Sequence, residues 1–433
     1  MERYESYKDS GVDWIGEIPD HWEVARLKNH LVDRKEKNNP IKTDFVLSLT
    51  NVDGVIPYSE KGDKGNKAKE DISGYMIAYP GDIVLNSMNV VIGSVGLSSY
   101  YGAVSPVYYM LHTRYNEDVR YFNYLFQTST LQNELKGLGN GILEIRMRIP
   151  MSKLNNVILP IPPKIEMRII SDYLDEKTSE IDSLIEKTER SIELLEEYRK
   201  SVISEAVTKG LDPDAPMKDS GIEWIGEIPA HWTAQGFTRP IESITDYRGR
   251  TPKKADSGRF LITGRNIKNG RIDYDASREY IPESEYNRAM QRGRLIKRAV
   301  LFTMEAPLGQ AAVVDDDSCA AAQRIIMLVP DVKRLNGSYL VYWIMSNQFQ
   351  SNLLTFATGS TASGIKASKL NQLKVILPPL PEQNRIASFL DTKTLEIDAL
   401  VTSQRKQIDL LREYRKSLIS EAVTGKFKVP GVA

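Results

Sequence analysis

The sequence contains very little cysteine and histidine, and this scarcity excludes several kinds of site. The one cysteine among 433 residues excludes an intramolecular disulfide framework and a cysteine-rich zinc site. The histidines lack the spacing of zinc ligands; they are His21, His30, His112 and His231. We therefore expect no metal site in this chain.

Motifs for nucleotide chemistry are also missing. No G-x-x-x-x-G-K-[ST] phosphate loop occurs, so the chain is not expected to hydrolyse ATP. No N-P-P-[FY] tetrapeptide is present to place an adenine for methyl transfer, because Asn39-Pro40 is followed by Ile41. The glycine-rich run Gly137-x-Gly139-x-Gly141 does not link a strand to a helix, and we interpret it as a loop. The sequence predicts a protein with no catalytic residues and no bound cofactor.

Long apolar runs are absent as well. None approaches the roughly 18–20 residues that a membrane span needs, and the polar start of the chain does not resemble a signal peptide. The composition, with 41% hydrophobic and 26% charged residues, is ordinary for a globular protein. We predict a cytoplasmic protein that is long enough for two or three domains.

The formal net charge of zero is an average over unlike parts. Residues 234–377 contain 21 basic and 13 acidic residues, a net charge of +8, and residues 24–153 are also net positive. Residues 154–208 contain 7 basic and 12 acidic residues, a net charge of −5. The basic segments favour a polyanionic partner such as nucleic acid, with scattered solvated lysines as the alternative.

What the chain does have is an internal repeat. Residues 8–22 and 218–232 are identical at 12 of 15 positions, and residues 197–208 and 413–424 at 11 of 12. The stretches between these repeated segments, which we call the first insert (residues 24–153) and the second insert (residues 234–377), have almost no mutual identity. The pattern predicts two copies of one fold that carry two different surfaces.

Two long helices are predicted, each after a proline cluster and each about 43–45 residues or roughly 65 Å long. Mostly apolar positions alternate at spacings of 4 and 3, with one polar residue and one arginine at matching places in each helix, which is the pattern of helices packed along their length. In the first helix these positions are Ile181, Ile185, Thr188, Ile192, Leu195, Arg199, Val202 and Ala206. In the second they are Ile397, Val401, Gln404, Ile408, Leu411, Arg415, Leu418 and Ala422. Because the polar positions coincide, we interpret the helices as partners of each other, with Thr188 and Gln404 restricting their register.

The inserts have a different pattern. Short β-type runs separated by glycines predict mostly β or α+β domains, with one helix near residues 119–136 and another near 338–356. The predicted strands are residues 44–49, 82–85, 90–97, 104–111, 259–263, 299–303, 311–314 and 324–329.

The repeated W-I-G-E-I-P-x-H-W segment, the proline-rich lead into each long helix and the E-Y-R-K-S-x-I-S-E-A-V-T end together resemble one family. They are similar to the specificity subunit of type I restriction–modification systems, over the whole chain from residue 8 to about residue 428. One departure is that Pro381-Glu382-Gln383 replaces Ile165-Glu166-Met167 of the first copy, which would affect a helix start.

The resemblance implies an α+β fold with a pseudo-twofold internal repeat, in which an antiparallel coiled coil separates two target recognition domains. Each recognition domain would read one half of a split site in double-stranded DNA, and the coiled coil would dock two methyltransferase subunits. Two motor-nuclease (restriction/translocase) subunits would complete the enzyme. S-adenosylmethionine would belong to the methyltransferase partner, and ATP and Mg to the motor-nuclease partner.

The corresponding domain boundaries are as follows. The first recognition domain is expected at residues 1–160, the first long helix at 161–209, a linker at 210–217, the second recognition domain at 218–377 and the second long helix at 378–425.

Candidate DNA-binding residues are basic and amide-bearing side chains in the loops of the inserts. Basic groups suit phosphates, asparagine can bind adenine at two atoms, and arginine can bind guanine or a phosphate. In the first insert the candidates are Lys61, Lys64, Lys67, Lys69, Asn86, Ser87, Asn89, Arg146 and Arg148. In the second they are Arg248, Arg250, Lys253, Lys254, Arg265, Asn266, Ser360, Thr361, Ser363 and Lys366. For each residue the alternative is an ordinary solvated loop position.

The tryptophans of the repeated segments are interpreted differently. Residues that read different half-sites should differ between the copies, whereas Trp14, Trp22, Trp224 and Trp232 are common to both. We therefore predict that they are packing anchors rather than platforms for base stacking, and that His21 and His231 accompany them.

Two other functions were weighed. A self-sufficient DNA methyltransferase or nuclease is disfavoured by the missing motifs and the lack of a further domain. A coiled-coil adaptor for two unrelated proteins is disfavoured by the basic inserts. A gel shift with random duplex across a range of salt would separate the adaptor from a DNA-binding protein.

Overall fold

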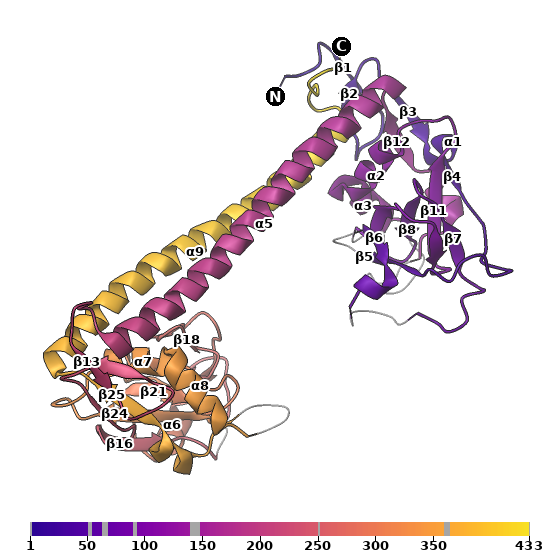
Figure 1. Cartoon of the computed structure of the whole chain (residues 1–433). Helices are drawn as coiled ribbons and strands as arrows, with labels where there is room; N and C mark the ends of the chain where they lie inside the picture. Colours follow the sequence, from indigo (N-terminus) through magenta and orange to yellow (C-terminus); the bar gives the residue numbers. More distant parts are fainter. Residues whose placement is uncertain are drawn as a thin grey trace. The chain divides into compact units, whose positions relative to one another are not determined.

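The computed structural model describes residues 2–50, 54–62, 68–89, 93–138, 148–249, 252–358 and 364–432. The chain forms two compact units (Figure 1). Unit 1 comprises Met1–Thr188 with Lys406–Ala433, and unit 2 comprises Glu189–Arg405. Each unit includes part of helix α5 (Lys164–Lys209) and part of helix α9 (Leu380–Val423). No described helix is both long enough and apolar enough to cross a membrane.

The first insert is built around an antiparallel sheet of four strands in the order β4-β11-β8-β9. Successive side chains of its central strand β8 (Ile83–Asn86) enter different cores, because strand residues alternate between the two faces. Ile83 and Leu85 join the core that contains the helix α2, whereas Val84 joins a smaller cluster with Leu47. The other strands of the sheet are β4 (Leu31–Asp33), β11 (Tyr108–Thr113) and β9 (Val95–Leu97).

The second insert contains a sheet of the same design, with the antiparallel order β16-β24-β21-β22. Its central strand β21 (Val300–Thr303) again alternates, since Val300 and Phe302 face the core with helix α7 and Leu301 faces another core. Two inserts with almost no sequence identity therefore share one strand order. The other strands are β16 (Ile241–Asp246), β24 (Ile325–Pro330) and β22 (Ala311–Val313).

Smaller elements complete each unit. In unit 1 they are β1 (Tyr7–Asp9), β2 (Glu17–Pro19), β3 (Glu23–Arg26), α1 (Leu27–His30), β5 (Leu47–Thr50), β6 (Gly54–Pro57), η1 (Tyr58–Glu60), β7 (Met76–Ala78), β10 (Gly102–Val104), α4 (Met151–Leu154) and β12 (Ile158–Ile161). In unit 2 they are β13 (Met217–Asp219), β14 (Glu227–Pro229), β15 (Thr233–Gly236), β17 (Arg259–Ile262), β18 (Ile267–Lys268), β19 (Arg271–Ile272), β20 (Tyr280–Ile281), α6 (Glu283–Ala289), β23 (Ala320–Ala321), η3 (Ala367–Gln372) and β25 (Lys374–Leu377). The predicted strands correspond to described strands, except that residues 90–92 lie outside the described part and residues 104–111 contain a turn between β10 and β11.

The one helix predicted in each insert is in fact two. The first insert contains α2 (Val119–Gln127) and α3 (Ser129–Lys136), and the second contains α7 (Gly337–Met345) and α8 (Asn347–Thr355). The break lies at Thr128 in one and at Ser346 in the other, where the hydroxyl oxygen accepts the backbone N–H three residues later. Hydroxyl residues cap helix starts in this way, so at each break the capping residue begins a second helix.

The repeated tryptophans are packing anchors, as predicted. Trp22 and Trp232 are fully buried, and Trp14 and Trp224 pack against the cores of their units. The Nε1 of Trp22 donates to Oε1 of Glu166 at 3.0 Å, and His21 Nε2 lies 2.8 Å from the other oxygen of that carboxylate. His231 makes the matching 2.8 Å contact with Glu382. Helices α5 and α9 start at equivalent positions, Lys164 and Leu380, so the Pro381-Glu382-Gln383 departure does not move the helix start.

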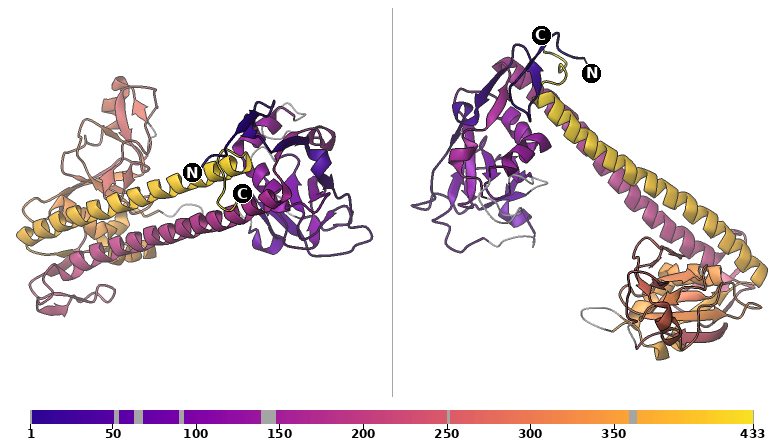
Figure 2. Two further views of the ribbon diagram at one scale, coloured as in Figure 1. Left: turned by 90° about the horizontal axis from the view of Figure 1, so that it is seen from above. Right: turned by 180° about the vertical axis from the view of Figure 1, so that it is seen from behind.

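Each tryptophan also packs on the glycine that follows a long helix. A Cβ added to Gly210, after α5, would lie 3.1 Å from Cζ2 of Trp232. A Cβ added to Gly425, after α9, would lie 2.5 Å from Cδ of Pro19 and 3.2 Å from Trp22. Both glycines have positive φ, 81° and 70°, as expected for residues that end helices. Because unit 1 contains both the beginning and the end of the chain, the two termini lie close together in Figures 1 and 2.

Contacts in unit 2 show that α5 and α9 pair antiparallel. Gln404 Nε2 donates to Ser191 Oγ at 2.9 Å, and Arg199 Nε lies 3.4 Å from Oδ1 of Asp398. The residue number of the partner on α9 thus falls from 404 to 398 as the residue number on α5 rises from 191 to 199. In unit 1 the equivalent Arg415 pairs with Asp182 at 2.9 Å. The register role predicted for Thr188 is wrong, because its hydroxyl donates to the Leu184 carbonyl of its own helix at 2.7 Å.

Paired tyrosines fix the inserts to the long helices. Tyr121 Oη donates to the carbonyl oxygens of Pro160 and Val423 at 3.0 and 2.8 Å. Tyr339 Oη donates to those of Ile376 and Val207 at 2.9 and 3.3 Å. Three residues later, Tyr124 bonds Asp175 and Thr178, and Tyr342 bonds Asp391 and Thr394. Burial raises the pKa of all four hydroxyls, which therefore remain protonated donors.

Replacing Tyr339 by phenylalanine should lower the free energy of unfolding of unit 2 by roughly 1–3 kcal/mol, because two buried carbonyls lose a donor. Tyr121→Phe should do the same to unit 1. Urea denaturation of the full chain, followed by circular dichroism, measures both changes. Tyr115→Phe, at a side chain that is 59% exposed, is the control and should leave the transition in place. A wild-type transition for Tyr339→Phe would show that these bonds contribute nothing.

Candidate nucleic-acid interface

The structure places two of the three amide and hydroxyl candidates of the first insert, Asn86 and Ser87, inside the protein. Ser87 is fully buried, and its Oγ donates to the Val107 carbonyl at 2.7 Å. Asn86 is 8% exposed, and its Oδ1 accepts the backbone N–H of Met88 at 3.0 Å. Asn89, at the end of the same turn, is partly exposed. Ser87 is therefore a structural residue, and Asn86 contributes mainly to the turn after β8.

The basic candidates of the first insert lie nearer the surface. Lys69 and Arg148 are exposed, and Lys61 is partly exposed with its Nζ 5.3 Å from the ring centroid of Tyr58. Lys64, Lys67 and Arg146 lie outside the described residues.

In the second insert Asn266 is the clearest correction. Its side chain is fully buried, with Oδ1 accepting from the N–H and hydroxyl of Thr263 at 2.9 and 2.8 Å. Its Nδ2 donates to the carbonyls of Asp273 and Ser277 at 2.8 and 2.9 Å. All its bonding capacity is thus used to hold two loops together, and none is left for a base. The neighbouring Arg265 is exposed.

The remaining candidates of the second insert are scattered. Lys366 is exposed immediately before η3, and Lys254 Nζ is paired with Oε2 of Glu279 at 2.7 Å. Candidates outside the described residues are Arg250, Ser360, Thr361 and Ser363, as are Gly139 and Gly141 of the glycine-rich run.

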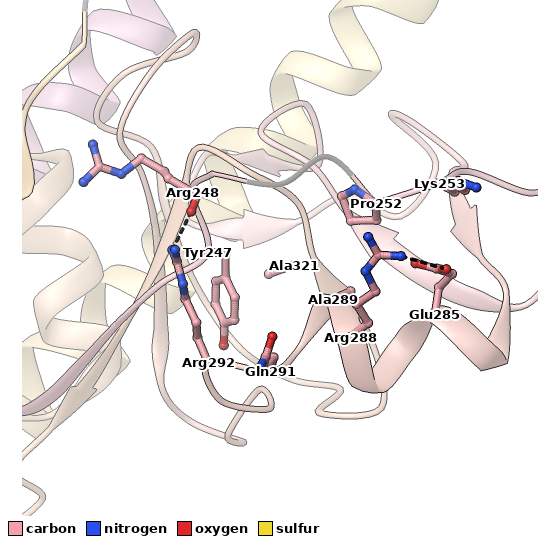
Figure 3. A pocket seen from close by; sticks show the side chains of 10 residues that line it. All are labelled: Tyr247, Arg248, Pro252, Lys253, Glu285, Arg288, Ala289, Gln291, Arg292 and Ala321. Atoms are coloured by element: carbon pink, nitrogen blue, oxygen red, sulfur yellow. Dashed lines mark hydrogen bonds and ion pairs between the residues drawn. The ribbon is translucent and has the colours of Figure 1, made fainter.

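Two predicted residues, Arg248 and Lys253, meet at a pocket with a volume of about 430 Å³ (Figure 3). Its wall is mixed; the lining residues are Tyr247, Arg248, Pro252, Lys253, Glu285, Arg288, Ala289, Gln291, Arg292 and Ala321. Burial raises the pKa of Tyr247, whose hydroxyl donates to the Gly293 carbonyl at 3.1 Å. Its described lining contains four basic residues and one acidic residue, so the pocket is basic, as is the insert that carries it.

Sequence reasoning missed four polar residues of this pocket: Glu285, Arg288, Gln291 and Arg292. They lie in α6 or just after it, a segment with no run of basic residues and no glycine-rich loop. The usable signal was Glu285 and Arg288, three residues apart, since residues at that spacing lie on one helix face.

Little else in the described residues suggests chemistry. No group of three or more His, Cys, Asp or Glu side chains there is arranged to hold a metal ion. Cys319 is buried, and burial raises the pKa of its thiol to about 12, so the reactive thiolate is suppressed.

Comparison with known proteins decides the family. The family described as type I restriction modification DNA specificity domain matches residues 19–194 and 238–409, one match for each copy of the repeat. The chain belongs to the family of type I restriction–modification specificity subunits.

Other specificity subunits are similar to this chain over part or nearly all of their length. The MjaVIII specificity subunit of Methanocaldococcus jannaschii is 23% identical, over 95% of this chain and 94% of that protein. The EcoBI specificity subunit of Escherichia coli is 22% identical over 63% of this chain and 59% of its own.

Solved structures share the fold of the specificity subunit. A chain from a study of complex assembly and conformational transition of the type I R-M system superposes with a TM-score of 0.70 at 15% identity, covering 94% of this chain and 98% of that one. The HsdS subunit from Thermoanaerobacter tengcongensis gives 0.55 at 16% identity with the same coverage.

Family membership assigns the specificity subunit its general role. It supplies DNA specificity to a type I restriction–modification system, with DNA and the other subunits of that system as its partners, and is itself non-catalytic. Each matched segment covers most of one insert and part of the long helix that follows it.

Asn266→Ala should lower the free energy of unfolding of unit 2 by roughly 2–4 kcal/mol, because four buried groups lose their partner together. Urea denaturation of the full specificity subunit provides the measurement. Arg265→Ala, at the exposed neighbour, is the matched control and should change stability by less than about 0.5 kcal/mol. A stable Asn266→Ala protein with altered DNA specificity would restore this residue to the DNA-binding set.

Proposed function

We propose that this specificity subunit directs N6-adenine methylation by its partner at a split DNA site, with each insert reading one half. The observation that carries the proposal is the shared strand order of two inserts whose loops differ in sequence. A common scaffold with different loops is suited to reading two unrelated half-sites.

The proposed domain organisation follows the sequence. Residues 1–160 and 218–377 form the recognition domains, residues 161–209 and 378–425 form the long helices, and residues 210–217 link the two copies. The long helices space the two recognition domains and dock the methyltransferase subunits.

The proposed DNA-binding set is narrower than the one predicted from sequence. It retains the exposed or partly exposed basic residues of the described loops: Lys61, Lys69, Arg148, Arg248, Lys253, Lys254, Arg265 and Lys366. Basic side chains of this kind bind phosphates, which supply most of the affinity and orient the protein on the duplex. Ser87 and Asn266 are withdrawn because their polar groups are used inside the protein.

The chemistry is proposed to belong to the partners. S-adenosylmethionine is carried by the methyltransferase subunit, and ATP and Mg by the restriction/translocase subunit, in a cytoplasmic complex. The specificity subunit contributes binding and orientation of the DNA.

Two methyltransferase and two restriction subunits are proposed for each specificity subunit. A surface that occurs once in each unit, on the long helices, supports two methyltransferase subunits. In unit 2, Leu194 and Tyr198 of α5 are 49% and 54% exposed. In unit 1, the equivalent Leu410 and Tyr414 of α9 are 57% and 48% exposed. Large apolar side chains left in solvent at matching positions are typical of a protein interface.

The partner helix extends this surface in each unit. In unit 1 Tyr414 lies near Tyr173 of α5. The pKa of Tyr173 is raised first by its own burial and then by the ionisable hydroxyl of Tyr414. In unit 2 the residue equivalent to Tyr173 is Phe389, which is also exposed. A surface that repeats while the inserts differ fits two copies of one partner, so the same methyltransferase subunit would dock on each unit.

Exchanging residues 24–153 for the corresponding insert of a relative should change one half of the methylated sequence and leave the other half unchanged. The reason is that the inserts share a scaffold and differ in their loops. Genome-wide mapping of N6-methyladenine in cells that express either complex measures the outcome. A target altered in both halves would mean that the inserts act as one site.

Changing Leu410 and Tyr414 to aspartate should reduce the bound methyltransferase from two copies to one, because buried charge opposes docking. Leu194→Asp with Tyr198→Asp should do the same, and all four changes should abolish docking. Light scattering of the purified complex gives the stoichiometry. Lys200→Ala with Lys416→Ala, at exposed equivalent positions outside this surface, is the control. Two bound copies in the fourfold variant would place docking elsewhere.

A further inference from the structure

The pocket of the second insert contains a hydrogen-bond donor, Arg288, and a hydrogen-bond acceptor, Glu285, and the edge of a base pair presents groups for both. Arg288 and Glu285 both belong to α6, and the Nη1 of Arg288 lies 3.6 Å from Oε1 of Glu285 (Figure 3). The arginine side chain is 62% exposed and the glutamate 24% exposed. An exposed ion pair of this length is weak, so the guanidinium can exchange its partner.

The other arginines of the pocket are already engaged. The guanidinium of Arg248 is held by Asp246 at 2.6 and 3.0 Å and points away from the other lining side chains in Figure 3. Arg292 Nη1 donates to the Asp246 carbonyl at 2.6 Å and also to that of Arg248. Arg292 therefore fixes the loop that carries Arg248, which leaves Arg288 as the arginine of this pocket with an exchangeable partner.

The carboxylate decides what this arginine binds. A phosphate bound to Arg288 would lie beside the Glu285 carboxylate, and two anions so close oppose each other. A base edge would not be repelled, since the N4 amino group of cytosine is a donor that a carboxylate accepts. Guanine presents two acceptors, O6 and N7, which match the two donors of an arginine fork. Arg288 and Glu285 together therefore match the two edges of a G·C pair.

The floor of the pocket suits the same ligand. Tyr247, Ala289 and Ala321 form an apolar wall, and the Tyr247 hydroxyl is occupied by the Gly293 carbonyl. An apolar floor with a few convergent polar groups at its mouth is the usual form of a site that orients a planar ligand.

We propose that Arg288 and Glu285 read one G·C base pair of the half-site bound by the second insert. Arg288 donates to guanine O6 and N7, and Glu285 accepts from cytosine N4. The assignment rests on the proposed function, because it requires that the second insert bind a half-site.

The test uses the complex of specificity and methyltransferase subunits. Insert exchange first identifies which half-site belongs to residues 234–377. Affinity is then measured by fluorescence anisotropy for duplexes in which each base pair of that half-site is changed in turn. The variants are Arg288→Ala and Glu285→Gln. Arg278→Ala is a matched control, because Arg278 pairs with Asp275 three residues earlier at 2.6 Å and does not line the pocket.

The wild-type complex should discriminate against changes at one G·C pair by about 5- to 150-fold, the range expected for a good two-point contact. Arg288→Ala and Glu285→Gln should both remove most of this discrimination at that same pair. Discrimination in the other half-site should persist, and Arg278→Ala should match the wild type. Thermal unfolding of each variant confirms that it is folded.

Three outcomes would overturn the assignment. The half-site could contain no G·C pair, or Arg288→Ala could behave as Arg278→Ala does. Alternatively, Arg288→Ala could weaken binding equally for all sequences while Glu285→Gln strengthens it, which would identify a phosphate contact. A wild-type complex that methylates without sequence preference would instead refute the proposed function itself, so the two failures are distinguishable.

Discussion

The burial of one tryptophan in each unit is the interaction on which the rest of the structure depends. Trp22 bonds Glu166 at the start of α5 and packs on Gly425 just after the end of α9. Trp232 packs on Gly210 after the end of α5, and its neighbour His231 bonds Glu382 at the start of α9. Each tryptophan thus joins the beginning of one long helix to the end of the other. Two helices tied in this way at both ends have a fixed direction and little freedom of register.

Inside this arrangement the inserts are held by a small number of matched contacts. The tyrosine pairs of α2 and α7 bond the same kinds of group in both units, an aspartate and a threonine of the adjoining long helix. Because few positions carry the attachment, the remaining residues of each insert can change without affecting the scaffold. This explains how two sheets with the same strand order coexist with almost no sequence identity.

Much of this could be predicted from the sequence, for physical reasons. A long 4-3 pattern specifies a helix over its whole length, and short β-type runs between glycines specify strands, so both were found. The tyrosine pairs occur as Y-x-x-Y in both inserts, but this spacing alone does not indicate which groups the hydroxyls bond. Asn266 and Ser87 were misjudged since a polar residue beside a strand bonds the backbone or a ligand depending on burial, which spacing does not reveal. Arg288 was missed because the pocket beside it is completed by Tyr247 and Ala321, which are distant in sequence.

The discontinuity of unit 1 has a consequence for synthesis of the protein. Unit 2 is a continuous segment, Glu189–Arg405, whereas unit 1 requires Lys406–Ala433 in addition to the first 188 residues. Lys426 Nζ, for example, donates to the carbonyls of Ile15 and Glu17 at 2.8 and 2.7 Å, and Lys428 N–H donates to that of Glu2. On the ribosome, the first insert must therefore wait with an incomplete core while the second folds, an inversion of the usual N-terminal-first order. A chain released early would expose that unfinished core, and exposed core residues are recognised by chaperones and proteases.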